Sequence, residues 1–322
     1  MDPLTQMIEL LAPHGFTWKD ASAAGNWAIR FPAHAGAAFC LIAAGSCRLG
    51  LPGQAPQRLD EGDFVLLVAP PRWTLSSGAR TVAIEFDRAA VKHGRIRSRL
   101  GSRGAPEVTR LIGGSFRFED ASAELLASLL PRVVTIRSSE PGAGRLRGVL
   151  GLVDDEAMAD RPGRTLVLAR LLEIMLVEAM RHGSRGAGEV RPGLVRGLAD
   201  PPVGRALRAL HGDLRRGWTV AQLAAAAGTS RSALAERFHR IVGLSPIDYL
   251  LRWRIARAKD ALRTGAGLAE VAAACGYGSA SAFSTAFRRV VGCAPGAYAV
   301  RGGDVSLEAK PAAPGPGRSV TR

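Results

Sequence analysis

Cysteine and histidine, the side chains that most often carry chemistry, are few and widely spaced in this chain. The histidines stand at positions 14, 34, 93, 182, 211 and 239, and the cysteines are Cys40, Cys47, Cys275 and Cys293. No Cys-x-x-Cys, His-x-His or His-Glu-x-x-His motif is present, although metal sites commonly use such short spacings. The sequence therefore predicts no metal site and no cofactor, and it offers no catalytic residue.

Two of the cysteines leave a redox role open. Cys40 and Cys47 lie seven residues apart in a strand-like stretch. A disulfide between them requires Cα atoms within about 7 Å of each other. Buried, unreactive thiols are the alternative interpretation. Cys275 and Cys293 are interpreted as core side chains, with no redox role.

Arginine supplies the other chemical signal, which is positive charge. The formal net charge is +15, and residues 201–322 carry 18 basic and 7 acidic side chains, against 25 and 21 in residues 1–200. This asymmetry favours a polyanion bound by the C-terminal third. A genome that favours arginine codons would also raise the charge, so the charge alone does not decide.

The basic C-terminal third contains an internal sequence repeat. Residues 219–250 and 267–299 match at an offset of 48 to 49 positions, and both end in Gly-x-x-Pro-x-x-Tyr, at Gly243–Tyr249 and Gly292–Tyr298. Each copy has the pattern of two short helices joined by a glycine turn, which predicts a helix-turn-helix. A plain helical bundle would explain the apolar periodicity but not the repeated endings.

Capping signals set the boundaries of the first unit. Thr219 is expected to begin a helix that ends at Ala227, with Gln222 as its capping-box partner. Gly228 is expected to end that helix in a left-handed conformation. Ser230 is expected to begin the second helix, Arg231–Val242.

The second unit is predicted in the same way. Its first helix spans Leu268–Cys275, Gly276 forms the turn, and Ser279 or Ser281 begins the second helix. A helix from Pro246 to Arg263 joins the two units. Its exposed face is expected to carry the basic residues Arg252, Arg254, Arg257 and Lys259.

Over residues 203–301 the chain resembles the AraC/XylS family of transcription regulators. The resemblance rests on the strings EVAAACGYGS and AFSTAFRRVVGCAPGAY and on the first unit that precedes them. It implies that the second helix of each unit enters a major groove of double-stranded DNA. It also implies that the joining helix holds the units about 34 Å apart, one turn of the duplex.

The resemblance also implies the residues that contact DNA. In the first unit they are Arg231, Ser232, Ala235 and Glu236, with Arg237 close by, and in the second unit Ala280, Ser281, Ser284 and Thr285. Family members often have Arg where this chain has Thr285, and the tyrosine ending usually precedes Arg rather than Ala299. Small side chains read bases weakly. We therefore expect the first unit to dominate specificity, while the second binds phosphates through Arg288, Arg289 and the helix N-terminus near Ser279 and Ser281.

The N-terminal third has the pattern of a β-rich domain. Short apolar runs separated by Gly and Pro predict a sandwich or barrel, with strands at 27–31, 37–43, 47–51, 63–68, 82–86 and 108–118. Gly113 and Gly114 suggest a bulge in the last strand. Residues 88–103 are interpreted as an exposed basic loop, and helices are expected at 122–130, 145–159 and 162–181.

The string MDPLTQMIELLAPHGF and the run RLIGGSFRF at 110–118 resemble the cupin-type sensor domain of one AraC subgroup. This resemblance implies a small barrel followed by helices that often dimerise. The helix at 162–181 is the favoured interface for a homodimer, with packing against the barrel as the alternative. His34 is the one histidine between residues 15 and 92, so a cupin enzyme's metal site is not expected.

Two hypotheses for sensing remain. A small-molecule effector would lie inside the barrel, lined by Trp27, Phe39, Leu41, Leu66 and Trp73, although these side chains could equally be plain core. Alternatively, Cys40 and Cys47 would react with an oxidant or electrophile. The candidate effector residues are therefore His34, Cys40, Cys47 and Trp73.

These observations predict an α+β protein of two domains. Residues 1–136 form the cupin-like domain, 137–200 a helical linker and dimerisation region, 203–301 the DNA-binding domain and 302–322 a disordered tail. The predicted function is ligand- or stress-responsive transcription regulation, with RNA polymerase as a candidate partner. A cupin enzyme with an accessory DNA-binding unit and an architectural DNA-binding protein each explain less. No apolar run reaches about 18 residues without charge, so we expect a cytoplasmic protein with no membrane span.

Overall fold

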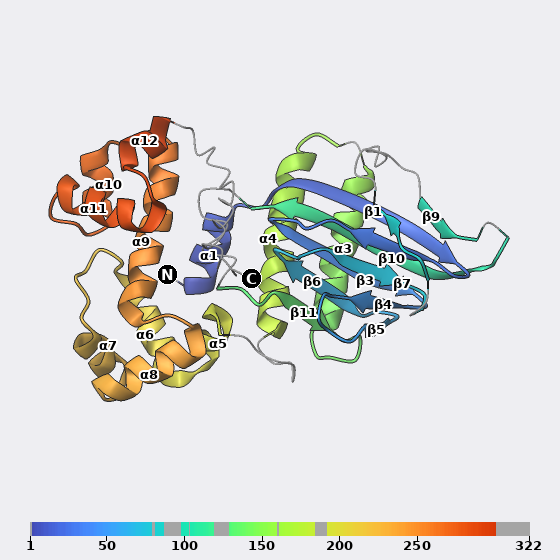
Figure 1. The fold of residues 1–322 in the computed structure, drawn as a ribbon, viewed down its shortest axis with the longest axis horizontal. Coiled ribbons are helices and arrows are strands. Elements are labelled where there is room, and N and C mark those ends of the chain that lie inside the picture. Colours follow the sequence, from blue (N-terminus) through green and yellow to red (C-terminus); the bar gives the residue numbers. More distant parts are fainter. Residues whose placement is uncertain are drawn as a thin grey trace, which may run out of the picture.

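The computed structural model describes residues 2–78, 81–86, 98–102, 104–118, 129–159, 161–183 and 192–300. Within these residues, strands and the helices α1 (Pro3–Leu11), α3 (Ala143–Met158) and α4 (Arg164–Gly183) make up the N-terminal part, and the helices from Leu194 onward make up the C-terminal part (Figure 1). The expected loop at 88–103 and helix at 122–130 lie largely outside the described residues, as does the expected tail at 302–322. Among the described helices, none is long and apolar enough to cross a membrane.

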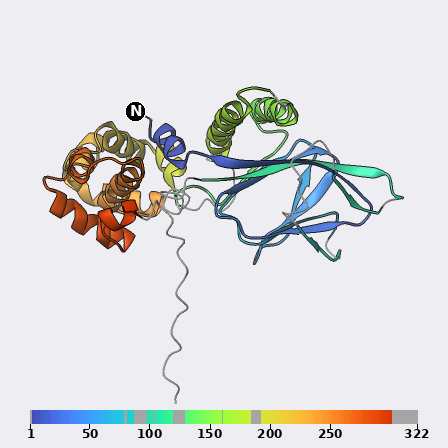
Figure 2. The same ribbon diagram turned by 90° about the horizontal axis from the view of Figure 1, so that it is seen from above.

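Two sheets face each other in the N-terminal part (Figure 2). Within the described residues, one sheet has the order β11-β6-β3-β10-β1-β9 and the other β5-β4-β7-β2-β8. The strands are β1 (His14–Ala24), β2 (Ala28–Phe31), β3 (Ala37–Ala44), β4 (Ser46–Gly50), β5 (Gln57–Asp60), β6 (Phe64–Val68), β7 (Trp73–Ser76), β8 (Ile84–Glu85), β9 (Ser98–Gly101), β10 (Glu107–Arg117) and β11 (Val133–Ile136).

The central strand β3 is buried on both faces, which explains its unbroken apolar sequence. Because side chains alternate along a strand, Cys40 and its neighbours on that face pack between the two sheets. Phe39 and Leu41 point the other way, into the core that the sheet shares with the helices, and Leu66 of β6 does the same. The prediction that Phe39, Leu41 and Leu66 line the barrel interior is therefore wrong, whereas Trp27 and Trp73 do lie between the sheets.

The six predicted strands are present, with boundaries that differ by a few residues. The predicted bulge at Gly113 and Gly114 is wrong, because both residues pair in regular register with β3 and the shift falls between Arg110 and Leu111. These glycines instead allow close backbone approach. A Cβ at Gly114 would lie 2.2 Å from the Thr17 carbonyl oxygen. The strand is also not the last, since β11 follows it.

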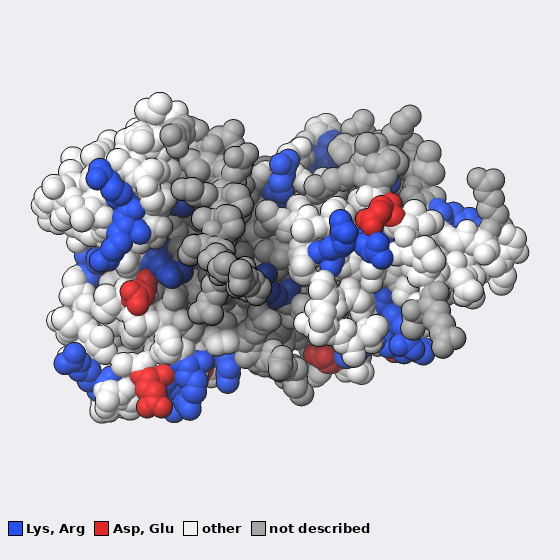
Figure 3. Space-filling model, viewed as in Figure 1, with Lys and Arg blue, Asp and Glu red and all other residues white. Residues whose placement is uncertain are grey.

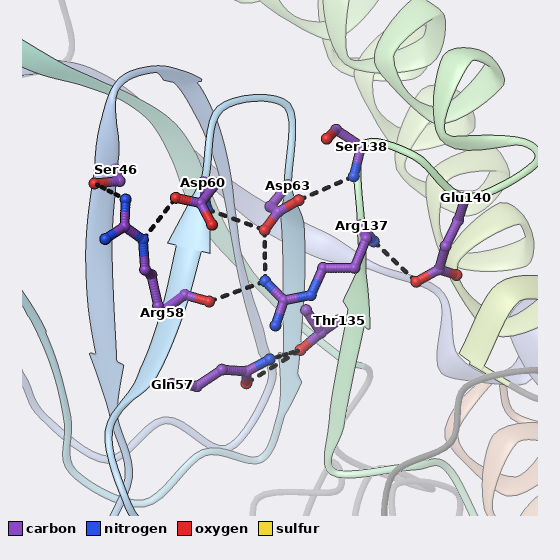
Figure 4. A network of polar contacts seen from close by, with 9 residues as sticks. All are labelled: Ser46, Gln57, Arg58, Asp60, Asp63, Thr135, Arg137, Ser138 and Glu140. Carbon is purple, nitrogen blue, oxygen red and sulfur yellow. Dashed lines mark hydrogen bonds and ion pairs between the residues drawn. The ribbon is translucent and has the colours of Figure 1, made fainter.

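The buried carboxylate of Asp63 joins the turn between β5 and β6 to the segment that leads from β11 into α3 (Figure 4). Asp63 is 2% exposed. Its carboxylate accepts hydrogen bonds from Arg137 Nη1 at 2.6 Å and from the Ser138 amide at 2.9 Å. Arg137 also donates to the carbonyl of Arg58 at 2.9 Å. Because both members of this ion pair are hydrogen-bonded, the pair fixes the direction in which the chain leaves β11 toward α3.

Three described helices accompany the sheets. They are α1 (Pro3–Leu11), α3 (Ala143–Met158) and α4 (Arg164–Gly183). Helices α3 and α4 lie side by side against the six-stranded sheet, close to the predicted positions (Figures 1 and 2). Helix α1 lies between the two parts of the chain, and its Met7 and Leu11 are fully buried in their shared core.

The C-terminal part is entirely helical in the described residues. Its helices are α5 (Leu194–Ala199), α6 (Pro201–Gly212), α7 (Val220–Ala227), α8 (Arg231–Val242), α9 (Pro246–Arg263), α10 (Leu268–Ala274), α11 (Ala280–Val291) and α12 (Pro295–Val300). Two separate apolar cores support them. The core around α6 to α8 is continuous with that of α1 and the sheet, whereas α10 to α12 and the end of α9 form a core of their own.

A buried hydrogen-bonded chain connects α1 to both α6 and α9. Gln6 Nε2 donates to the His211 carbonyl at 3.3 Å, and Gln6 Oε1 lies 2.7 Å from His211 Nδ1. Because the amide oxygen only accepts, Nδ1 carries the proton and Nε2 accepts from the Tyr249 hydroxyl at 2.7 Å. This chain fixes the N-terminal helix against the helix that joins the two repeat units.

Candidate nucleic-acid interface

The first helix-turn-helix unit is capped as its sequence predicts. The Gln222 amide donates to Thr219 Oγ1 at 3.2 Å and the Thr219 amide donates back to Gln222 Oε1 at 3.0 Å, which completes the capping box. Gly228 ends α7 at φ 65°, and Ser230 caps α8 by accepting from the Ala233 amide. These caps fix the angle at which α8 leaves the turn.

Helix α8 presents a polar face of the predicted composition. Leu234 and Phe238 are fully buried and hold the helix against α7. Arg231, Ser232 and Glu236 are exposed, and Ala235 is half-buried beside them. The structure therefore brings the four predicted base-reading residues to one accessible face.

Arg237 is oriented differently. Its Nε and Nη2 lie 2.9 and 2.7 Å from Asp200 Oδ2, in an ion pair between α8 and the N-terminus of α6. Asp200 also accepts from the Val203 amide at 3.2 Å. Partial burial raises the carboxyl pKa of Asp200, but the hydrogen bonds from Arg237 and the Val203 amide outweigh that effect and leave the pKa below its ordinary value. The ion pair of Arg237 with Asp200 holds α8 against the start of α6.

The second unit has the same layout, with Ser279 rather than Ser281 as the cap of α11. Its predicted base-facing residues cluster at the start of that helix, where Ser281 and Thr285 are exposed and Ala280 and Ser284 are half-buried. Two of the hydroxyls bond to their own helix, since Ser284 Oγ donates to the Ala280 carbonyl at 2.7 Å and Thr285 Oγ1 to the Ser281 carbonyl at 3.1 Å. These donors are therefore already used within the helix.

Basic side chains lie in the last turn of α11 and along α8. Arg288 and Arg289 are exposed in the last turn of α11. On the face shown in Figure 3, basic side chains near α8 stand beside acidic ones, so charge of both signs meets solvent there. Such a mixed surface suits binding that combines phosphate contacts with base contacts.

The joining helix α9 differs from its prediction on its basic face, where Arg252 and Lys259 are half-buried rather than exposed. Tyr249, Trp253 and the other predicted apolar residues are buried, and Arg257 is exposed. Arg254 is half-buried too, and it donates to the carbonyls of Leu214 at 2.7 Å and Arg216 at 2.8 Å. The prediction of an exposed Arg254 is wrong, because this side chain closes the loop after α6.

Three of the four candidate effector residues, Cys40, Cys47 and Trp73, share the core between the sheets, and His34 lies apart from them. His34 Nε2 lies 2.9 Å from the Phe116 carbonyl and the backbone amide of His34 donates to the Pro70 carbonyl at 3.0 Å, so this residue joins strand β10 to the segment before β7. Trp73 is buried between the sheets and stacks on Phe31 with ring centroids 4.1 Å apart. No cluster of three or more potential metal ligands occurs among the described residues.

The thiols in the sheets are shielded. Cys40 and Cys47 are both free, buried and part of the core between the sheets. Burial and then the nearby charges of Asp60 and Asp63 raise the pKa of Cys47 to about 12. Burial, followed by the proximity of Cys47, also raises the pKa of Cys40. High pKa values disfavour the thiolate that reacts with oxidants.

Sequence reasoning missed α5 and the start of α6, where Asp200 and Arg196 lie. The signal was present as Asp200-Pro201, because Asp at the N-cap followed by Pro is a strong helix start. The same dipeptide, Asp2-Pro3, begins α1.

Comparisons with known proteins agree with this layout. A cupin family model matches residues 2–184 and a helix-turn-helix domain model matches residues 223–301. An AraC-like transcription regulator of Streptomyces lividans is 39% identical over 300 residues, which cover 92% of this chain and 98% of that protein. The transcriptional regulator AlkR of Acinetobacter baylyi is 26% identical over 90% of this chain and 96% of its own length. Among solved structures, ToxT of Vibrio cholerae aligns over 88% of this chain and 96% of its own, with 12% identity and a TM-score of 0.35.

Proposed function

The chain belongs to the AraC-like transcription regulators with a cupin-type N-terminal domain, and on that premise we propose that α8 and α11 read two successive major-groove segments on one face of double-stranded DNA. The observation that carries the proposal is the duplicated, capped helix-turn-helix joined by the single helix α9. A rigid connection of this kind allows one chain to span about two half-sites.

The two units have different roles in this proposal. The bases are read by the residues that share the accessible face of α8, namely Arg231, Ser232, Ala235 and Glu236. The small side chains of Ala280, Ser281, Ser284 and Thr285 fit α11 into the groove, and the hydroxyl donors of Ser284 and Thr285 are already engaged in the helix. Arg288 and Arg289 contact phosphates, as does the helix N-terminus at Ser279. The first unit therefore sets most of the sequence preference.

A footprint of the full-length protein on its own upstream DNA tests the function. With excess nonspecific competitor at physiological salt, we expect one protected stretch of about 20 bp, or two such stretches, if two chains bind. Equal protection of the upstream DNA and of unrelated DNA would instead indicate nonspecific binding through charge.

Glu236→Ala is expected to change the sequence preference. Removing a base-reading side chain should cost about 1–3 kcal/mol at particular base pairs and leave the others unaffected. The measurement is binding to a panel of single base-pair variants of the footprinted site. Ala233→Ser, on the same helix, is the matched control. An equal loss of affinity on every sequence would contradict base reading by Glu236.

The effector is proposed to bind between the two sheets. The core between the sheets consists of apolar side chains from both of them, and Trp27 Nε1 is buried there without a hydrogen-bond partner in the described structure. A small apolar molecule with one acceptor group would satisfy this donor. The shielded thiols make direct reaction of Cys40 or Cys47 the less favoured route.

We propose that α1 couples the sensor to the reader. It packs against α4 on one side and against α6 and α9 on the other, and the Gln6–His211–Tyr249 chain fixes it there. The division at residues 136, 200 and 301 remains our proposal for the domains. The chain is proposed to act in the cytoplasm, without catalysis, and with RNA polymerase as a partner.

A homodimer is proposed through α4 and its neighbour α3. Leu168 and Leu172 lie on the buried face of α4. On its other face, Leu166 is 63% exposed and Ile174 is 47% exposed. Leu152 of α3 adds to this apolar surface at 56% exposed. A second copy would cover it.

The double variant Leu166→Glu, Ile174→Glu is expected to convert a dimer into a monomer, because two buried carboxylates would oppose association. Sedimentation equilibrium measures the mass, with Arg48→Glu on β4 as the control for added negative charge. A wild-type chain that sediments as a monomer at every concentration would contradict the proposed interface.

A further inference from the structure

The side chain of Arg254 contacts both helix-turn-helix units. It lies in the middle of α9, the helix that joins the units (Figure 1). Its Nε donates to the Leu214 carbonyl at 2.7 Å, and its Nη2 donates to the carbonyls of Arg215 at 3.2 Å and Arg216 at 2.8 Å. Its Cζ lies 5.7 Å from the ring centroid of Tyr277, in the turn before α11. One side chain therefore connects the loop between α6 and α7 with the turn of the second unit.

The same loop and turn also meet backbone to backbone at Gly276. Gly276 has φ 76°, in the left-handed region that favours glycine. A Cβ at this position would overlap the carbonyl oxygen of Arg215, so a larger residue would push the loop and the turn apart. Cys275, the residue before it, donates from Sγ to the Arg254 carbonyl at 3.3 Å. The turn of the second unit is thus held against α9 and against the loop at one point.

The loop that Arg254 contacts is internally ordered. The carboxylate of Asp213 accepts from the amides of Arg215 at 3.0 Å and Arg216 at 3.1 Å. Trp218 Nε1 donates to the Asp213 carbonyl at 2.9 Å, and the Arg216 guanidinium lies 4.2 Å from the centroid of the Trp218 ring. The loop therefore presents its carbonyls to Arg254 in a fixed arrangement.

These contacts lie where two separate apolar cores meet on α9. Trp253 belongs to the core that supports the first unit, and Ile255 belongs to the core of the second. Because the cores are separate, packing within each of them does not fix the angle between the units. Helix α9 has 18 residues, and helices of this length bend. The contacts around Arg254 brace the helix at its middle.

We infer that the Arg254 junction, made of Arg254, the loop carbonyls and the Gly276 turn, fixes the register of the second unit on DNA relative to the first. A shift by one nucleotide moves a phosphate contact by about 3.4 Å along the duplex and about 34° around it. A braced α9 does not follow such a shift, whereas an unbraced one does. Arg254 is thus a positioning residue for α11. The inference rests on the proposed function, since it needs α8 and α11 in successive major grooves.

The test locates the phosphates that the second unit contacts in the full-length wild-type protein and in Arg254→Met. Single methylphosphonates, which remove one backbone charge, are placed in turn along the second half-site of the footprinted DNA. We expect the wild-type protein to lose roughly tenfold in affinity at one or two positions, because a charge-assisted hydrogen bond is lost there. In Arg254→Met the loss should be about threefold or less at each position and spread over several neighbouring phosphates, because the second unit shifts along the backbone.

Arg257→Met is the matched control. Arg257 is an exposed arginine of α9 less than one turn from Arg254, so its substitution removes the same charge from the same helix. This variant should keep the sharp wild-type pattern along the second half-site. The same sharp pattern in Arg254→Met would overturn the inference and leave DNA reading by both units intact.

The salt dependence of DNA affinity separates positioning from folding. A displaced but folded second unit keeps Arg288 and Arg289 on phosphates, so Arg254→Met should retain the wild-type slope of log affinity against log salt. A slope reduced by about two would show that the second unit has unfolded, and Asp213→Ala then decides. Asp213 is exposed and takes no part in the core of α10 to α12, so its loss loosens the loop alone. The pattern should spread in this variant too, and a sharp pattern would overturn the inference.

Failure of the proposed function gives a different result. If no methylphosphonate in the second half-site weakens binding of the wild-type protein, α11 contacts no phosphate there. The proposed binding of α11 in a second major groove would then be overturned, and the inferred register with it.

Discussion

Phe287→Ala is expected to unfold the second helix-turn-helix unit and leave the first one intact. Phe287 is fully buried in the core that α10 to α12 share with the end of α9. Its ring contacts Phe283 and Tyr298, with centroids 5.5 and 5.6 Å apart. Removing such a ring costs about 3–5 kcal/mol, because the cavity that it leaves is only partly refilled.

This cost is large relative to the size of the core that carries it. The second unit has a core separate from the one that joins α1, α6, α7 and α8. A small domain has only a narrow margin of stability. Helix α9 belongs to both cores, with Trp253 in the first and Leu262 in the second, so its first half should remain folded. Local unfolding is therefore expected rather than collapse of the whole chain.

The footprint of Phe287→Ala reports the loss on DNA. We expect protection to contract from about 20 bp to about 10 bp, because a single half-site remains covered. Amide hydrogen exchange should show lost protection in α10 and α11 and retained protection in α7 and α8. Val290→Ala, at a position that is 40% exposed on the same helix, is the matched control. Unfolding of both units together would show that the two cores are not independent.

The capping residues explain why the reader domain was predictable. Thr219, Gly228 and Ser230 determine their helix ends through contacts within four residues, and such local signals are present in the sequence. The ion pair of Arg237 with Asp200 joins residues 37 positions apart. Nothing in the local pattern distinguishes Arg237 from a base-reading arginine, so its role required the fold.

The sheets show the same division between local and long-range information. The burial of β3 on both faces follows from its unbroken apolar sequence, but which face meets the helices does not. Strand β1 was missed because HGFTWKDASAA has no strict alternation and its residues are mostly half-buried. The shielding of Cys47 on β4 also depends on the opposite sheet, since the core that buries it includes Val65 of β6 and Leu111 of β10. Reactivity of the thiols therefore could not be judged from their spacing.

Acidification is expected to weaken the contact between α1 and the reader domain through His211. This side chain is 3% exposed, and burial lowers its pKa to about 4. Its neutral ring donates from Nδ1 and accepts at Nε2, so both nitrogens are already used. A second proton would displace the hydrogen bond from Tyr249, whose ring and that of Trp253 pack around the imidazole.

The sign follows from the two pKa values. In the unfolded chain histidine binds a proton below about pH 6.5, whereas in the folded chain His211 remains neutral until about pH 4. The unfolded state thus binds more protons between these values, so the contribution of His211 to stability is complete above pH 6.5 and decreases as the pH falls toward 4. Between pH 7 and pH 5 the loss is about 2 kcal/mol.

His211→Gln should remove this component, because glutamine keeps hydrogen-bonding groups but does not titrate. Urea unfolding at pH 7 and pH 5 gives the free energy of unfolding of both proteins. We expect the wild-type protein to lose about 2 kcal/mol more than the variant over this range. His239→Gln removes an exposed histidine of α8 and should behave as wild type. Equal losses in wild type and His211→Gln would show that the imidazole is not kept neutral at the α1 contact, and the hydrogen-bonded chain could not then hold the two parts of the protein together as described.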